Sequence, residues 1–154
     1  MTQQENTQQT KAETFREKVA KGTAVCFNQQ CPRYGRCLRA DLAPYADSSQ
    51  RVVASINPRY THAADGQCDM FMDNTLVKMP VGMTKHFFYD MPARIAKAIR
   101  RRLIADSCRY TYYKYHNGEV PITPQRLKTI ERICREEGWT APLVFDGEVE
   151  DYVW

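Results

Sequence analysis

Residues 91–133 read MPARIAKAIRRRLIADSCRYTYYKYHNGEVPITPQRLKTIERI, and the apolar pattern at the start of this stretch decides the fold of the C-terminal half. Proline suits the first turn of a helix, where Pro92 stands, because its missing N–H would have no intrahelical partner there. Ile95, Ile99 and Leu103 then recur at intervals of four residues, which places them on one helix face. The stretch therefore predicts a long helix that starts beside Pro92.

Two shorter helices are predicted further along the same stretch. The first covers Arg109–His116 and ends at Asn117 and Gly118, because both residue types tolerate a positive φ. The second starts at Thr123 and Pro124, with threonine as the N-cap and proline in the first turn. The C-terminal half is therefore predicted to be mainly helical.

Charge is distributed unevenly along the chain. The 154 residues contain 22 Lys or Arg and 18 Asp or Glu, which gives a net charge of +4. Residues 85–135 hold twelve basic and four acidic residues, for a net charge of +8, whereas residues 136–154 hold six acidic residues and no basic one, for a net charge of −6. Such asymmetry indicates a surface that faces a polyanion, and the alternative is a solvated helix face whose charges pair with the acidic tail.

The segment YTYYKYHNGEVPITPQRLKTIERI, within residues 100–133, resembles the end of a helix-turn-helix domain of the Cro and phage-repressor class. In that class a recognition helix ends in an aromatic residue, followed by Asn-Gly, a proline-containing loop and a further helix. The resemblance implies duplex DNA as a partner, with base edges read in the major groove and phosphates held by basic side chains. The residues assigned to DNA are Lys97, Arg100, Arg101, Arg102, Arg109, Thr111, Tyr112, Lys114, His116 and Arg126.

The first part of this motif departs from the class. Arg102 stands where the class has a small residue, and Ser107 stands at the usual apolar position of the turn. Four tyrosines between positions 110 and 115 also exceed what a helix needs to read a groove. The alternative interpretation is a three-helix unit whose aromatic stripe packs inward.

Three cysteines in the N-terminal half, Cys26, Cys31 and Cys37, follow the pattern C-x4-C-x5-C. Thiolates that converge on one point bind zinc or an iron–sulfur cluster, and a tetrahedral site needs four ligands. Cys68 is the predicted fourth ligand, and His62 is its substitute because neutral imidazole also binds zinc. Buried free thiols or one incidental disulfide remain the alternatives.

The segments between these landmarks predict an α+β protein, with a small Cys-bound lobe that contains a short antiparallel sheet and a helical lobe that resembles helix-turn-helix. Residues 51–57, 68–72 and 76–81 have the composition of strands.

Three regions follow from these segments. Residues 1–22 are predicted to be a partly disordered segment with one short helix. Residues 23–84 form the Cys-rich lobe, and residues 85–154 form the helical lobe with its acidic tail.

Several function classes lack support in the chain. No apolar run approaches the ~20 residues that cross a bilayer, so no membrane partner is predicted. The polar N-terminus does not resemble a secretory signal. The protein is therefore predicted to be cytoplasmic, with reduced cysteines. No phosphate-binding glycine loop or G-x-S-x-G motif occurs, and no residue is assigned a catalytic role.

Most of the chain resembles a small, uncharacterised bacterial protein family, on the blocks CFNQQCPRYGRCLR and ICREEGWTAPLVFDGEVEDYVW. The resemblance brings no function with it. The leading hypothesis is a DNA-binding regulatory protein with a structural or redox-sensing thiolate metal site. The alternative is a zinc-stabilised adaptor that binds another protein and no nucleic acid, and an iron–sulfur redox protein comes third.

Overall fold

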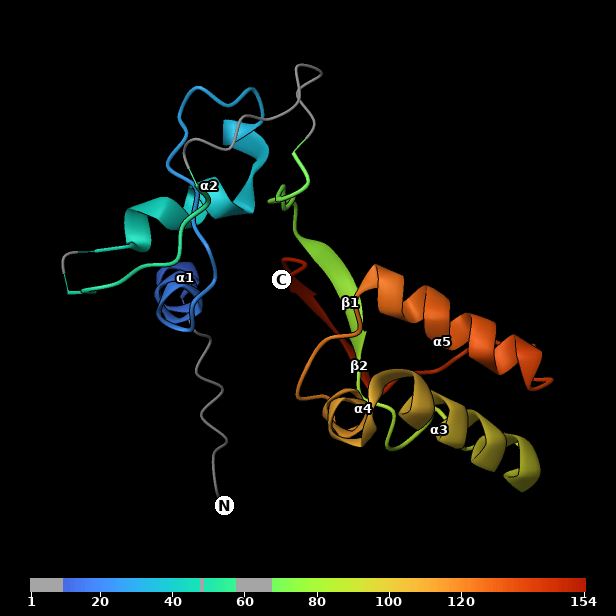
Figure 1. Cartoon of the computed structure of the whole chain (residues 1–154). Coiled ribbons are helices and arrows are strands. Elements are labelled where there is room, and N and C mark those ends of the chain that lie inside the picture. Colours follow the sequence, from blue (N-terminus) through green and yellow to red (C-terminus); the bar gives the residue numbers. More distant parts are fainter. Residues whose placement is uncertain (1–9, 48, 58–67) are drawn as a thin grey trace. The chain divides into compact units, whose positions relative to one another are not determined.

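The computed structural model of the chain describes residues 10–47, 49–57 and 68–154, and it divides into two units (Figure 1). Unit 1 is Met1–Thr75 with Trp154, and unit 2 is Leu76–Val153. The described residues form five α-helices and one two-stranded antiparallel sheet, which confirms the predicted α+β class. None of the described helices combines the length and the apolar composition needed to cross a bilayer.

Unit 1 begins with helix α1, Lys11–Ala20, which is fixed at its start by a capping box. The Glu13 amide donates to Thr10 Oγ1 at 3.3 Å, and the Thr10 amide donates to Glu13 Oε2 at 2.8 Å. The buried face of the helix carries Phe15, whose ring meets the rings of Tyr45 and Trp154 edge-on at 5.3 and 5.9 Å. The helix predicted near the N-terminus is therefore present, held by a cap and an aromatic cluster.

Short elements make up the rest of unit 1: the 3-10 helix η1 (Tyr34–Arg36), helix α2 (Leu38–Leu42) and the 3-10 helix η2 (Ala43–Tyr45). Leu38 and Leu42 are fully buried at either end of α2. None of these three elements exceeds five residues, so this part of unit 1 has little regular backbone hydrogen bonding.

Two of the three predicted strands are wrong. Residues 51–57 make only an isolated bridge, between Ser55 and Val25, and Val52 is 90% exposed. Residues 68–72 form a turn, in which the Phe71 amide donates to the Cys68 carbonyl at 3.1 Å. Among the described residues, neither segment lies beside a strand, and an isolated extended segment cannot satisfy its backbone groups or bury alternate side chains.

The sheet belongs to unit 2 rather than to the Cys-rich part of the chain. Strand β1, Val77–Val81, pairs with β2, Gly147–Asp151, and Met79 stands opposite Val149 (Figure 1). The predicted strand at 76–81 is thus confirmed, but its partner comes from the acidic tail, and the unit boundary lies at residue 75 instead of residue 84. Sequence composition cannot reveal this pairing because the two strands are far apart in the chain.

Three helices complete unit 2: α3 (Ala93–Ser107), α4 (Arg109–His116) and α5 (Pro124–Glu136), as predicted. The Thr123 hydroxyl caps α5 by accepting from the Arg126 amide at 3.3 Å. The core of the unit is a cluster of buried side chains drawn from all three helices and from the segments around them: Met83, Phe87, Met91, Ile99, Leu103, Tyr112, Ile122, Ile130, Ile133 and Cys134.

Asp146 joins the segment before β2 to the segment after β1. Its carboxylate accepts hydrogen bonds from the Thr84 amide at 2.7 Å, the Thr84 hydroxyl at 2.7 Å and the Lys85 amide at 2.9 Å. Burial raises its pKa, but these hydrogen bonds outweigh burial and lower the pKa of Asp146 to about 2. The Asp146 amide also donates to the Gly82 carbonyl at 3.1 Å. The residue after β1 is thus hydrogen-bonded to the residue before β2.

Asp146→Asn is expected to destabilise unit 2 by about 2 kcal/mol at neutral pH, because the folded carboxylate has a lower pKa than the unfolded one. This stabilisation is fully present above pH ~4 and is lost as the pH falls toward ~2. Urea unfolding of both proteins across this pH range measures the effect. Glu148→Gln, an exposed change on β2, is the control, and a stability difference that does not shrink in acid would contradict the assignment.

Candidate thiolate site and basic helical surface

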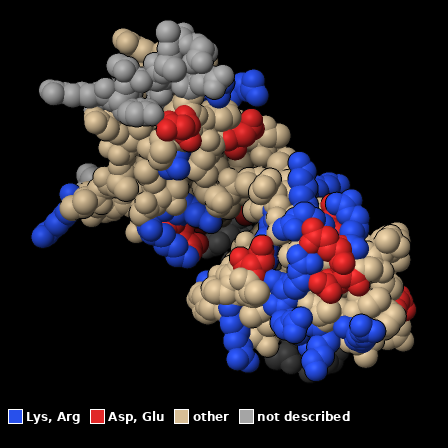
Figure 2. Space-filling view, turned by 45° about the vertical axis from the view of Figure 1, so that its right-hand side comes forward, with Lys and Arg blue, Asp and Glu red and all other residues tan. Residues whose placement is uncertain are grey.

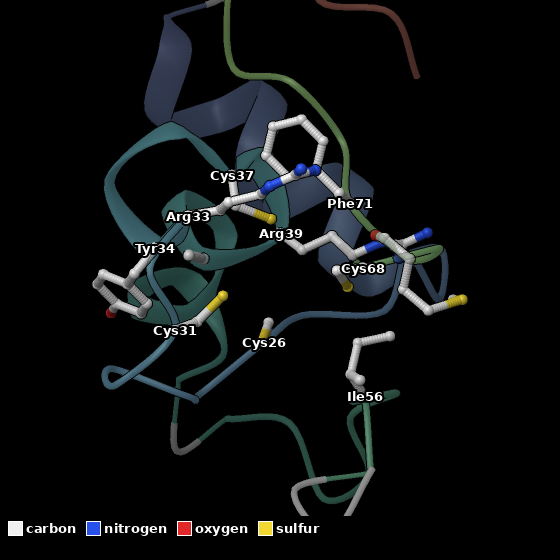
Figure 3. Close-up of a pocket in the computed structure, with 11 residues that line it drawn as sticks. Cys26, Cys31, Arg33, Tyr34, Cys37, Arg39, Ile56, Cys68 and Phe71 are labelled. Atoms are coloured by element: carbon white, nitrogen blue, oxygen red, sulfur yellow. The ribbon is translucent and has the colours of Figure 1, made fainter. Parts of the chain in front are cut away.

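Four cysteines of unit 1 line a single cavity of about 20 Å³ (Figure 3). They are Cys26, Cys31, Cys37 and Cys68, the same four residues that the sequence assigned to a metal. Three come from the short stretch between residues 26 and 37, whereas Cys68 comes from a segment 31 residues further along the chain. His62, the predicted substitute ligand, lies outside the described residues.

Local turns and bridges bring the cysteines to the cavity. Cys31 lies in a turn, where its amide donates to the Asn28 carbonyl at 3.2 Å and its carbonyl accepts from the Tyr34 amide at 2.9 Å. Cys37 precedes α2 and forms an isolated antiparallel bridge with Asp73. That bridge holds the segment just after Cys68 against the segment that carries Cys37, so the long gap in sequence closes at the cavity.

All six cysteines of the chain are free thiols, and Cys37 is buried. Within the described residues, no group of three or more His, Cys, Asp or Glu side chains is arranged to hold a metal ion. The donor set of four thiols nevertheless suits zinc, for which the Zn–S distance is about 2.3 Å. A tetrahedral site therefore requires the four side chains to turn further toward the centre of the cavity.

Two arginines line the same cavity, and sequence reasoning did not single them out. The Arg33 guanidinium lies over the Phe71 ring at 5.0 Å. The half-buried Arg39 donates through Nε to the Met70 carbonyl and through a terminal nitrogen to the Ala24 carbonyl, both at 2.8 Å. The signal in the sequence was the interleaving of basic residues with cysteines in CPRYGRCLR.

The two remaining cysteines behave differently from each other. Cys134 is buried in the core of unit 2, and burial raises the pKa of its thiol to about 11. Cys108 is exposed. Its neutral thiol donates to the Thr111 hydroxyl at 3.3 Å. Hydrogen bonds from the Thr111 side chain and backbone to the thiolate form lower the pKa of Cys108.

The basic block is spread over the surface of unit 2, where Lys and Arg side chains surround a smaller acidic group (Figure 2). Lys97 and Arg101 of α3 and Arg109 of α4 are exposed, as DNA contact requires. Arg94, which was not assigned to DNA, is exposed and shares one helical stripe with Lys97 and Arg101. Arg100, another predicted contact, is exposed as well.

Two other predicted DNA contacts, Arg102 and Arg126, form ion pairs within unit 2. The Arg102 guanidinium pairs with Glu136 and also with Glu137, the latter at 3.0 Å. Arg126 pairs with Asp106, and its side chain is only 14% exposed. These pairs tie α3 to α5, because each joins a residue of α3 to a residue in or beside α5. Their guanidinium groups are therefore engaged before any phosphate approaches.

The burial of Tyr112 argues against its assignment to base reading in the major groove. It is only 1% exposed and lies in the core of unit 2, where burial raises the pKa of its hydroxyl against the opposing effect of Arg100. The Arg100 guanidinium itself lies over the Phe88 ring at 4.9 Å. A helix as short as α4 must bury one face to be stable, and Tyr112 is the residue on that face.

The remaining residues of α4 that were assigned to DNA are half-buried: Thr111, Lys114 and His116. The Thr111 hydroxyl accepts from Cys108, and the Lys114 ammonium lies over the Tyr110 ring at 4.6 Å. The His116 ring lies beside the Tyr112 ring, 5.5 Å between centroids. Helices α3 and α4 meet at Cys108 alone, with φ 68°, whereas a DNA-binding helix-turn-helix has a turn of about three to four residues.

The acidic tail, residues 136–154, contacts the basic helices at its start and forms a strand further along. Glu136 and Glu137, at the end of α5, pair with Arg102 of α3. Residues 147–151 form β2, in which Glu150 stands opposite Lys78 of β1. One part of the tail therefore pairs with the basic block, and another part adds a strand to the sheet.

A second, larger cavity of about 610 Å³ lies within unit 2, between one face of the sheet, α5 and the segment after α5. Apolar side chains such as Leu127, Trp139 and Phe145 line it together with charges of both signs. Its volume falls in the range of small-ligand and peptide pockets, about 300–1,000 Å³. Sequence reasoning did not predict this groove because its walls come from three separate segments.

Comparison with known proteins places the chain in a family. No curated protein and no solved structure matches it. A family model described as a family of unknown function, DUF6078, matches residues 6–154, which include both units and all four cysteines of the cavity. The chain therefore belongs to the DUF6078 family.

Proposed function

We propose that this protein binds one zinc ion through Cys26, Cys31, Cys37 and Cys68, and that its helical unit binds duplex DNA through phosphate contacts. The first part rests on the cavity that is lined by all four cysteines, three from one short stretch and Cys68 from a distant segment. Four thiolates leave no open coordination position, so the zinc has a structural role and activates no water. Thiolate coordination needs reduced cysteines, so a reducing compartment such as the cytoplasm is part of this proposal.

A single ion suits the cavity better than an iron–sulfur cluster. A volume of about 20 Å³ is close to the space of one water molecule, whereas a cluster also needs room for several iron and sulfide ions. We therefore favour a structural zinc ion over a redox-active iron–sulfur cluster at this site. The visible spectrum separates them, since zinc thiolates are colourless and iron–sulfur clusters absorb strongly.

Elemental analysis of protein purified without oxygen is expected to find one zinc per chain. Cys31→Ser is expected to lower this content to well below one zinc, because serine is a poor zinc ligand. Cys108→Ser is the matched control, since Cys108 is also accessible but lies in unit 2. Absence of zinc in the wild type, or equal loss in both variants, would overturn the site.

The DNA proposal rests on the exposed stripe of α3 and its neighbour Arg109. Phosphate contacts supply affinity without reading bases, and they need accessible cations rather than a groove-reading helix. The burial of Tyr112 argues against one predicted base contact, and the ion pairs of Arg102 and Arg126 engage two predicted phosphate contacts. Lys97, Arg101 and Arg109 stay exposed. We therefore propose binding that is governed by charge and has weak sequence preference.

A salt titration with duplex DNA tests this proposal. The plot of log K against log salt has a slope of about −0.9 for each phosphate contact, so Lys97→Ala with Arg101→Ala is expected to flatten the slope by about 2. Arg36→Ala with Arg51→Ala removes the same charge from unit 1 and is expected to leave the slope unchanged. Equal slopes for both double variants, or no binding at low salt, would contradict DNA binding through α3.

A zinc-stabilised adaptor without nucleic-acid binding is the second candidate. The observation that favours it is the cavity of about 610 Å³ in unit 2, which has the size and the mixed apolar and charged lining of a binding groove. This candidate keeps the zinc site and replaces DNA by a protein partner. Failure of the salt titration with retention of zinc would favour it.

A further inference from the structure

The side chain of Arg39 links the two ends of the candidate zinc site, and this link rests on the site proposed above. Its Nε donates to the Met70 carbonyl, two residues after Cys68, and a terminal nitrogen donates to the Ala24 carbonyl, two residues before Cys26. Both distances are 2.8 Å. One planar guanidinium therefore spans two chain segments that are far apart in the sequence.

The backbone of Arg39 adds a third connection. Its carbonyl accepts from the Cys26 amide at 2.9 Å, and Arg39 itself follows Cys37 by two residues in α2. Figure 3 shows the Arg39 side chain extended along the cavity toward the segment that carries Cys68. Three of the four cysteines are thus on segments that Arg39 joins directly.

Charge makes the same position favourable for an arginine. A zinc ion with four thiolates carries a double negative charge, and Arg39 and Arg33 are among the residues that line the cavity that would hold it. A guanidinium is always protonated and presents donors in a fixed fork, so it can hold two carbonyls and offset the charge at once. Lysine would keep the charge without the fork.

We infer that Arg39 is the positioning residue of the thiolate site: it holds the segments of Cys26 and Cys68 at the spacing that four-thiolate coordination of one zinc ion requires. It touches no metal itself. Outer partners of metal ligands change affinity by about 10–100-fold when they are removed, and Arg39 acts through backbone carbonyls rather than through a ligand side chain.

Zinc competition titrations on the full chain test this inference. Arg39→Met is expected to weaken zinc binding by about 10–100-fold. Arg39→Lys is expected to weaken it nearly as much, because it keeps the charge but cannot span both carbonyls. The control is Arg36→Met, a neighbour in η1 whose side chain is 80% exposed and pairs only at 3.6 Å with Asp73; it is expected to stay within about twofold of the wild type.

Cobalt(II) at saturating concentration separates positioning from loss of stability. A positioning role predicts weaker sulfur-to-cobalt charge-transfer absorption in both Arg39 variants, because fewer thiolates reach the metal. A purely structural role would leave the spectrum of the saturated protein unchanged, and this result would overturn the inference, as would wild-type zinc affinity in either variant. Arg39→Lys keeps the test decisive if Arg39→Met does not fold. If the wild type binds neither metal, the proposed zinc site itself fails, which is a different outcome.

Discussion

Removing zinc with a chelator is expected to unfold unit 1 while the helices of unit 2 remain folded. Structural zinc contributes folding free energy directly, about 10–16 kcal/mol of apparent binding energy in zinc-finger peptides. A unit that depends on this term loses its structure when the metal is withdrawn. A unit with its own apolar core does not.

The composition of the two cores explains the difference. Unit 1 has helices of ten, three, five and three residues, and its described residues contain no sheet. Domains below about 70–80 residues rarely obtain more than about 3–5 kcal/mol from one core, and both units are close to this size. Unit 1 has the shorter elements, and the proposed zinc is its staple. Unit 2 buries a cluster of ten side chains and has helices of fifteen, eight and thirteen residues, so its core depends less on a staple.

Amide hydrogen exchange with and without chelator measures this prediction. Protection of α1 and α2 is expected to collapse on chelation and to return when zinc is restored. Protection of α3 and α5 serves as the internal control and is expected to change little. Unchanged protection of α1 and α2 in protein shown to have lost its zinc would contradict a structural role for the metal.

Tyr112→Ala is expected to destabilise unit 2 by about 3–5 kcal/mol, the range for truncation of large buried aromatic side chains. Tyr112 is 1% exposed, packs edge-on against Tyr113 at 5.2 Å and joins α4 to the core. Loss of this side chain leaves a cavity that the short helix α4 cannot close. Urea unfolding followed by helical circular dichroism measures the loss.

Tyr110→Ala is the matched control on the same helix. Tyr110 is 71% exposed, so its truncation is expected to change the stability by less than about 0.5 kcal/mol. The pair separates the two sequence interpretations of the tyrosine-rich helix, since a core residue affects folding and a groove-reading residue affects binding. A Tyr112→Ala protein that keeps wild-type stability but loses DNA affinity would restore Tyr112 as a contact.

The helices were predictable because their signals are local. Pro92, Thr123 and Pro124 mark helix starts through their own backbone properties, and Ile99 and Leu103 lie one turn apart on the buried face of α3. Such signals need no information about distant residues. The segment 51–57 has strand-like composition as well, but a strand also needs a partner, and composition does not say whether one exists.

The candidate site was predictable in part for a related reason. The spacing of Cys26, Cys31 and Cys37 confines three thiols to a short loop, so their proximity follows from chain length alone. The choice of Cys68 was an inference from residue type, and the structure places it at the same cavity. Arg39 was not predicted, because its function depends on two carbonyl groups that lie far apart along the chain.

The sequence by itself determined the helical character of residues 93–136, the group of four cysteines and the opposition of a basic block and an acidic tail. Only the tertiary structure decided where the charges act. It pairs the tail with β1 as a strand, turns Tyr112 inward and engages Arg102 with the end of α5. The physical reason is that charge and polarity are properties of single residues, whereas exposure and pairing depend on which distant segments share a core.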